Sequence, residues 1–65
     1  MYSILVTSDY IYVMEFKLDG TAEEAMTQIE AKGYASAFAA DRRKVVKVGV
    51  NFSSETRTID RWIIS

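Results

Sequence analysis

Apolar residues gather in segments of the chain that have the length of β-strands. Strands are expected at residues 2–6, 10–18, 44–50 and 57–64. The turn-like residues 7–9 join the first two segments as a β-hairpin. The third segment is rich in β-branched side chains, which is typical of a strand well inside a sheet. We expect an irregular, alanine-rich connection at 34–43 and a loop at 51–55.

Residues 22–32 have the pattern of an amphipathic helix. Their apolar positions recur at the spacing of one helical face: Ala22, Ala25, Met26 and Ile29. Thr21 and Glu24 form a capping box at the start, and Gly33 supplies a left-handed cap at the end. The order of the elements predicts an α+β fold, ββαββ, with one helix packed on a small four-stranded sheet.

The composition describes a small protein that folds. The 65 residues are 49% hydrophobic and 26% charged, with no proline, repeat or low-complexity tract, so residues 1–65 are expected to form a single domain. A chain of this length hides only about 60% of the surface of its unfolded form. Without cysteine or histidine it has no disulfide and no zinc site to compensate. We therefore expect oligomerisation or a larger parent protein to supply the missing stability.

The absence of histidine and cysteine also restricts the possible chemistry. It excludes Ser-His and Cys-His nucleophiles, thiol redox chemistry and the common zinc sites. A bound metal would be a hard ion such as Mg²⁺ or Mn²⁺, held by carboxylates and water. No segment has the roughly 20 apolar residues of a membrane span or the pattern of a secretory leader, which predicts a cytoplasmic protein without a membrane partner.

Charge is unevenly divided along the chain, although the formal net charge is only −1. Residues 1–41 carry two basic and seven acidic side chains, whereas residues 42–65 carry six basic and two acidic ones. The basic segment offers nucleic-acid phosphates the side chains of Arg42, Arg43, Lys44 and Lys47. It could equally pair with the acidic half, within one molecule or across a dimer. An ordinary solvated surface is the favoured interpretation, because such asymmetry is a weak signal in a short chain.

The second predicted strand carries the candidate chemistry. Side chains alternate along a strand, so Glu15 and Lys17 face the same side. A carboxylate can hold a divalent metal while a neighbouring ammonium orients water or stabilises charge on a phosphate. From the spacing alone, the polar end of a half-exposed strand is the favoured interpretation. Asp19 lies on the same face but roughly 13 Å from Glu15 along an extended strand, too far to share one metal. Gln28 is expected at the edge of the apolar helical face, either in solvent or directed toward the sheet.

A longer stretch of sequence changes this balance. The string YVMEFKLDGTAEEA at 12–25, with QIE at 28–30 and KGYA at 32–35, resembles the PD-(D/E)xK nuclease superfamily. More narrowly, it resembles the nuclease-like domain at the C-terminus of bacterial proteins that also carry an AAA-ATPase-like domain. Residues 38–41, 43–45 and 49–53 continue the resemblance, which covers nearly the whole chain and favours a functional origin for the Glu-x-Lys pair.

The resemblance implies a fold and a set of roles. The family core is αβββαβ, of the restriction-endonuclease type, and its motif joins an Asp on one strand to the Glu-x-Lys of the next. Glu15 would then be the metal-binding acid and Lys17 the catalytic lysine, with Mg²⁺ or Mn²⁺ bridging to the scissile phosphate of DNA. Gln28 and Tyr34 would correspond to the glutamine and tyrosine that related nucleases carry near the site.

The sequence also departs from the family pattern. The position of the motif Asp falls near Tyr2, and residues 1–8 contain no acid. A phenol with a pKa of about 10 does not replace a carboxylate as a magnesium ligand at neutral pH. The helix and strand that open the family core have no counterpart, so the chain reads as a domain truncated at its N-terminus. We expect the isolated chain to be inactive unless a partner subunit supplies the missing acid.

Three functional hypotheses follow. The first is a truncated nuclease-like domain whose ancestral activity is metal-dependent DNA cleavage, and the second is a non-catalytic dimerisation or interaction module. The third is a remnant that binds nucleic acid through its basic segment without cutting it. An open sheet edge and an uncovered apolar face favour a homodimer. Its interface is expected to bury some of Tyr2, Ile4, Tyr10, Tyr12 and Trp62.

Overall fold

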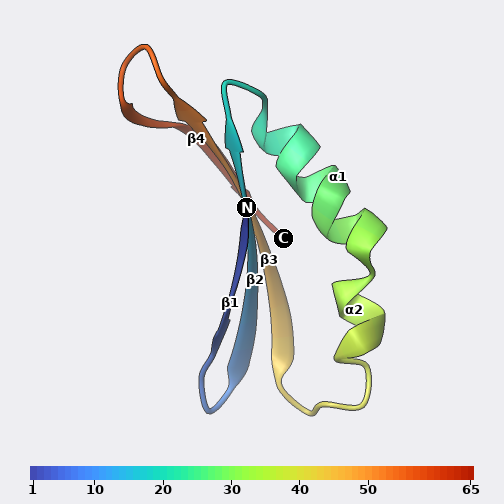
Figure 1. Cartoon of the computed structure of the whole chain (residues 1–65). Coiled ribbons are helices and arrows are strands. Elements are labelled where there is room, and N and C mark those ends of the chain that lie inside the picture. The colour runs from blue at the N-terminus through green and yellow to red at the C-terminus, as the bar shows by residue number, and fades with distance from the viewer.

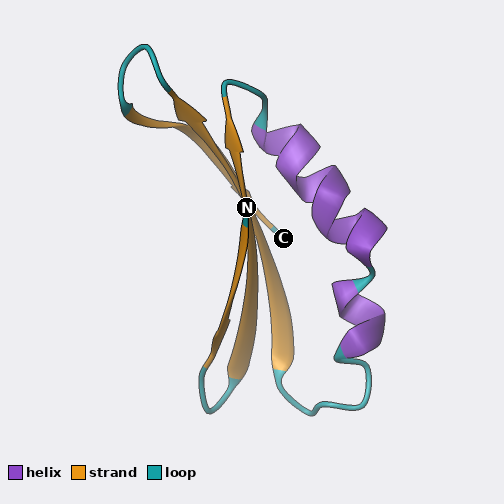
Figure 2. Cartoon of the chain, viewed as in Figure 1, coloured by secondary structure: helices purple, strands orange, loops and turns teal.

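One helical layer covers one face of a four-stranded sheet. The computed structural model describes residues 1–65, except for the side chain of Ala35. Its elements are β1 (Tyr2–Val6), β2 (Tyr10–Leu18), α1 (Ala22–Lys32), α2 (Tyr34–Ala37), β3 (Lys44–Ser53) and β4 (Thr58–Ile64). Both helices lie on the same side of the sheet (Figures 1 and 2). The expected α+β fold is confirmed. No helix in the described part of the chain is long and apolar enough to cross a membrane.

The sheet is mixed, with the strands in the order β1-β2-β3-β4. β1 and β2 form the expected antiparallel hairpin, and β3 and β4 form a second one. β2 and β3 are parallel, from the pair Tyr10 and Lys44 to the pair Leu18 and Phe52. Parallel neighbours need a long crossover, and the two helices provide it. Because β2 lies between β1 and β3, the strand that carries Glu15 is an inner strand, and α1 packs on it and on β3.

The capping residues of α1 lie where the sequence predicts them. The Oγ1 atom of Thr21 accepts a 2.9 Å hydrogen bond from the amide of Glu24, which confirms the hydroxyl half of the capping box. Gly33 ends the helix in the left-handed conformation, with φ of 68°, and its amide donates to the carbonyl of Glu30. These two caps fix the length of the helix and hence the height of each of its residues above the sheet.

The core lies between α1 and the inner strands. Ile11, Val13 and Ile29 form its buried centre. Ala22 and Ala25 are also fully buried, so the predicted apolar stripe of α1 does face the sheet. Gly49 of β3 lies beneath the start of the helix, where a Cβ atom would come within 2.8 Å of both the Ala22 carbonyl oxygen and Met26 Cγ. The absence of a side chain at residue 49 therefore sets how closely α1 approaches the sheet.

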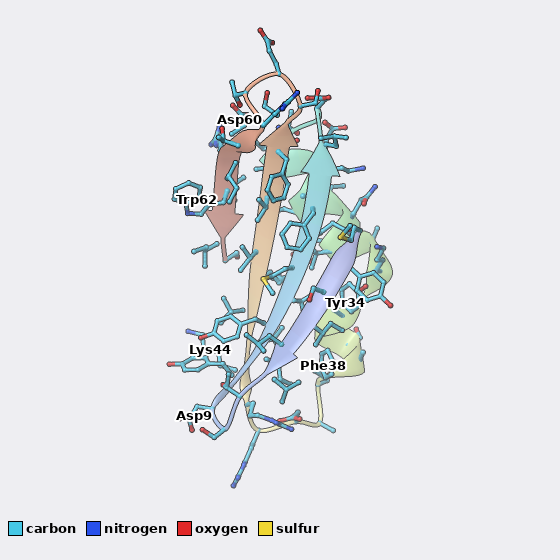
Figure 3. The ribbon with its side chains drawn as sticks, turned by 60° about the vertical axis from the view of Figure 1, so that its left-hand side comes forward. Asp9, Tyr34, Phe38, Lys44, Asp60 and Trp62 are labelled. Carbon is cyan, nitrogen blue, oxygen red and sulfur yellow. The ribbon has the colours of Figure 1, made fainter. Side chains whose placement is uncertain are left out.

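The opposite face of the sheet, here called the open face, has no covering element (Figure 1). Strand alternation and register place the following side chains on it: Tyr12, Met14, Phe16, Val46, Val48, Val50, Trp62 and Ile64. Figure 3 shows Trp62 projecting from β4 on the side away from the helices. Trp62 is 60% exposed and Ile64 is 63% exposed, so large apolar side chains meet solvent here. The middle of the open face contains no charged residue.

The connection expected to be irregular contains one helical turn. α2 follows directly after Gly33, with the amides of Ala37 and Phe38 donating to the carbonyls of Gly33 and Tyr34. The prediction was wrong there because alanine favours a helical turn even where no apolar periodicity is visible. The turn positions Tyr34 and Phe38 against the core.

The last two strands also differ from the prediction. β3 continues to Ser53 because Asn51, although polar, is buried and accepts a 2.9 Å hydrogen bond from the amide of Gly20. Arg57 lies in the turn, since its φ of 60° is incompatible with a strand. An irregularity in the pairing of β3 with β4 places Ile59 opposite Phe52, out of phase with Arg61. The final strand alternates poorly in the sequence because of this irregularity.

Candidate functional site

Glu15 occupies the covered face of the sheet, in the middle of β2. Its side chain is fully buried, on the same face as Ile11 and Val13, as strand alternation predicts. Gly49 lies beside it on β3, and Tyr2 lies opposite it on β1. The amide of Phe16 donates to the carbonyl of Met1, so the next pair, Tyr2 and Glu15, is of the non-hydrogen-bonded kind. The Cα atoms of such pairs lie about 4.5 Å apart.

Two cationic groups approach the Glu15 carboxylate. The Nζ atom of Lys32 lies 2.6 Å from Oε1, and the amino group of Met1 lies 3.2 Å from Oε2. Oε2 accepts no well-directed hydrogen bond from the described residues. Burial raises the pKa of Glu15, but the hydrogen bonds and positive charges of Lys32 and the Met1 amino group outweigh it and hold the pKa below its ordinary value of 4.5. The same bond to Glu15 raises the pKa of Lys32. Glu15 is therefore a carboxylate at neutral pH.

Aromatic rings complete the surroundings of the Lys32 ammonium. Its Nζ atom lies 4.8 Å from the centroid of the Tyr2 ring, within the range of a cation–π interaction. The Tyr34 ring lies 5.7 Å from the Tyr2 ring, at an interplanar angle of 43°. Figure 3 shows Tyr34 on the helical side of the sheet, near β1. Tyr34 is thus close to Glu15's partners, and α2 places it there.

Lys17 and Gln28 come together at a different point. Both line a shallow hollow of about 340 Å³ beside the first turns of α1, and the other lining residues are Glu23, Glu24 and Thr27. Lys17 makes no ion pair with the residues that the structure describes. The four predicted site residues therefore form two pairs: Glu15 lies near Tyr34, and Lys17 lies near Gln28. Their catalytic roles stay predictions.

Sequence reasoning missed Lys32, the principal partner of Glu15. The signal was present, because Lys32 follows Ile29 by three residues and so continues the apolar stripe of α1 toward the sheet. A basic residue in the last helical turn is usually assigned to the helix dipole and solvent. Here its ammonium reaches a buried carboxylate on β2 instead.

Half of the basic side chains in residues 42–65 are paired within the molecule. Arg43 binds the carboxylate of Asp41 and donates a 3.2 Å hydrogen bond to the carbonyl of Thr7. Lys47 forms an ion pair with Glu30. Arg61 lies 3.6 Å from Glu23, another pair between the basic and acidic parts of the sequence. Arg42 and Lys44 are exposed and have no ion-pair partner among the described residues.

The Glu-x-Lys strand, its antiparallel neighbour and the helical crossover to a parallel strand define a small α+β domain of nuclease type. The chain belongs to the PD-(D/E)XK nuclease superfamily, whose sequence profile matches residues 2–62. No curated protein and no solved structure showed a significant similarity to the chain. Nucleases of this superfamily generally use divalent metal ions.

The residues around Glu15 do not fit a divalent metal. The described residues contain no group of three or more acidic side chains that could hold one. Asp19 accepts hydrogen bonds from the amide and hydroxyl of Ser54, so it is engaged with the turn between β3 and β4. Tyr2, which offers a phenol in place of a carboxylate, occupies the position opposite Glu15. One carboxylate already paired with an ammonium leaves a hard cation without ligands.

Proposed function

We propose that the chain is a nuclease-like domain that keeps the fold of its superfamily but does not cleave phosphodiesters by itself. The observation that carries the proposal is the environment of Glu15, a buried carboxylate paired with Lys32 and facing Tyr2 across the hairpin. Metal-dependent hydrolysis requires a divalent ion held by several oxygen ligands. A single neutralised carboxylate does not hold such an ion, so magnesium- or manganese-dependent cleavage of DNA is not expected of this chain alone.

A cleavage assay tests this proposal. The wild-type protein, Glu15→Gln and Lys17→Met are each incubated with single- and double-stranded DNA in the presence of Mg²⁺ or Mn²⁺. All three are expected to release no more product than a protein-free blank. Metal-dependent cleavage by the wild type that disappears in Glu15→Gln would overturn the proposal and restore the nuclease assignment of Glu15 and Lys17.

The open face supports a second candidate function, the pairing of two copies of the chain. Its central residues are uncharged and apolar, so two copies can meet face to face without burying a charge. The molecule measures 40 × 23 × 16 Å. Its broad face is therefore comparable to the roughly 800 Å² that each partner buries in a standard interface. A homodimer would cover an apolar surface that the small core leaves exposed.

The residues expected in this interface need one correction. Tyr10, Tyr12 and Trp62 lie on the open face, but Tyr2 and Ile4 pair with Glu15 and Val13 and so lie on the covered face. The prediction did not separate the two faces because it selected large apolar residues without their register. Only the first three can share one flat interface.

Sedimentation equilibrium on matched variants tests the dimer. Trp62→Lys introduces a charge on the open face, whereas Ile4→Lys introduces the same charge at an exposed position on the other face. The wild type and Ile4→Lys are expected to sediment as dimers at micromolar concentration, and Trp62→Lys as a monomer. A monomeric wild type would contradict the pairing function.

Nucleic-acid contact is the weaker candidate, because Arg43 and Lys47 already pair with acidic residues and leave Arg42 and Lys44 for phosphates. Its signature would be salt-sensitive DNA binding that survives Glu15→Ala and falls when Arg42 and Lys44 are replaced by alanine.

The narrower sequence resemblance favours an association of this domain with an AAA-ATPase-like domain. Direct calorimetric titration of such a domain with this chain tests that association.

A further inference from the structure

Lys32 lies beside groups that suit a cation. Its ammonium is 2.6 Å from a carboxylate oxygen of Glu15 and 4.8 Å from the centroid of the Tyr2 ring. Tyr34 packs against Tyr2 and adds a second aromatic ring to the same wall. The ammonium is attracted both to the buried carboxylate and to the face of the aromatic ring.

The Glu15 carboxylate is already neutralised without a metal. The Lys32 ammonium lies 2.6 Å from its Oε1 atom, and the Met1 amino group lies 3.2 Å from its Oε2 atom. Tyr2 stands where a second carboxylate would lie closest to Glu15, so the facing residue adds no negative charge. A divalent ion would add two positive charges beside a buried carboxylate that already has ammonium partners, which is costly. Ammonium groups are the cations that match the residues present, and Lys32 makes the shorter contact.

We propose that the ammonium of Lys32 is the resident cation of this site and occupies, beside Glu15, the place that a divalent metal would take. The site is thus metal-free in the folded protein. Its part-buried ion pair joins β2 to α1, and the Tyr2 ring of β1 lies against the same ammonium. The inference concerns binding and stability, and it rests on the same Glu15 environment as the proposed function. Metal binding without DNA cleavage would contradict the inference alone, whereas metal-dependent cleavage would contradict both.

The register of β1 and β2 shows which substitutions should convert this site into one that binds a metal. Tyr2→Asp places a second carboxylate opposite Glu15, in a pair of side chains that lie close together. Lys32→Met removes the ammonium and keeps a side chain of similar length. Together the two changes remove the Lys32 ammonium and place two carboxylates opposite each other, with the Met1 amino group as the one remaining cation beside them. Two facing carboxylates are an arrangement that attracts a hard divalent ion.

Calorimetric titration with Mn²⁺ and thermal melting give independent readouts. The wild type and Glu15→Gln are expected to show no saturable binding at millimolar Mn²⁺. The double variant Tyr2→Asp/Lys32→Met is expected to bind Mn²⁺ and to melt at a higher temperature when the ion is added. Lys32→Met alone should lower the melting temperature by about 10 °C, because it takes from a buried carboxylate the closer of its two ammonium partners. Lys44→Met, at an exposed lysine, is the matched control and should leave it unchanged.

Saturable Mn²⁺ binding by the wild type that is lost in Glu15→Gln would overturn the inference. Should the variants fail to fold, paramagnetic broadening by Mn²⁺ in the NMR spectrum of the wild-type protein decides the question. The inference predicts no selective broadening of the amide signals of residues 2, 15 and 34. Selective loss of those three signals at low Mn²⁺ would show that a metal binds beside Glu15 despite Lys32.

Discussion

The two faces of the sheet differ in polarity, although the same strands form both. On the covered face, β2 and β3 present Glu15, Lys17, Lys47 and Asn51 among apolar residues, and helix or turn residues contact most of these polar groups. On the open face, the middle of the same strands is apolar and has no layer above it. Polar side chains are therefore concentrated where partners exist within the chain, whereas the apolar side chains of the open face have no covering layer in the described part of the chain.

The comparison of the two faces shows that residues matching a catalytic motif need not be placed to perform catalysis. Glu15 and Lys17 match the Glu-x-Lys pattern of the superfamily, yet among the described residues only Glu15 forms ion pairs, and its partners are ammonium groups. The apolar residues of the open face match no catalytic motif, yet Trp62 and Ile64 among them are more than half exposed. In this domain the covered face carries the Glu-x-Lys pair, while the open face carries the apolar surface on which we propose that two copies of the chain pair.

The largest expected effect comes from removing a core side chain on the covered face. Ile29→Ala is expected to lower the free energy of unfolding by about 2–5 kcal/mol, because Ile29 is 1% exposed and packs between Ile11 and Val13. Ile64→Ala makes the same truncation on the open face, where Ile64 is 63% exposed, and should change it by less than about 0.5 kcal/mol under conditions that keep the protein monomeric. Urea denaturation measures both; equal losses would erase the contrast between the faces.

A smaller loss is expected where the helix approaches the sheet most closely. Gly49→Ala should cost about 1–3 kcal/mol, because the new Cβ would lie 2.8 Å from the Ala22 carbonyl oxygen and from Met26 Cγ. Gly20→Ala is the comparison, since its nearest neighbour is the flexible carboxylate of Glu24 at 3.1 Å. The melting temperature of Gly49→Ala should be well below that of Gly20→Ala. The reverse order would contradict the close approach of α1 to β3 at Gly49.

The ionic contact of the covered face predicts a dependence of stability on pH. The pKa of Glu15 is lower in the folded protein than its ordinary value of 4.5, so the unfolded chain binds more protons as the pH falls. The contribution of Glu15 to stability is therefore complete above about pH 4.5 and is lost as the pH falls through the folded-state pKa.

Chemical denaturation between pH 7 and pH 3 measures this dependence, with the wild type losing more stability than Glu15→Gln. The pKa values of Asp19 and Asp41 are also lowered, by their bonds to Ser54 and Arg43, so both proteins retain some acid sensitivity. Asp19→Asn serves as the control for that background. Identical slopes for the wild type and Glu15→Gln would mean that Glu15 is not held as a carboxylate.

The smallest effect is expected in the turn between β3 and β4. Arg57 has a φ of 60°, a conformation that costs an L-residue roughly 1 kcal/mol and costs glycine little. Arg57→Gly should therefore raise the free energy of unfolding by up to about 0.5 kcal/mol after the greater freedom of the unfolded chain is subtracted. Glu55→Gly, in the same turn but without a positive φ, should lower it. Urea midpoints distinguish the two signs.

The sequence allowed the fold to be predicted where a pattern had a local cause. The hairpin, the bounds of α1 and the shared face of Glu15 and Lys17 depend on alternation and on caps such as Thr21 and Gly33. The end of β3 could not be predicted, because Asn51 remains in the strand only through its bond to Gly20, which is distant in the chain. The partner of Glu15 was missed for the same reason: the Lys32 contact depends on how α1 lies over β2.

The side-chain carboxyl of Glu15 offers the most direct test of the claim that Lys32 holds it in place of a metal. A carbon-detected NMR titration of that carboxyl, with and without millimolar Mg²⁺, measures its pKa and its response to the ion. The account predicts a midpoint below 4.5 that Mg²⁺ does not move. A midpoint at or above 4.5, or one that falls further when Mg²⁺ is added, would contradict it.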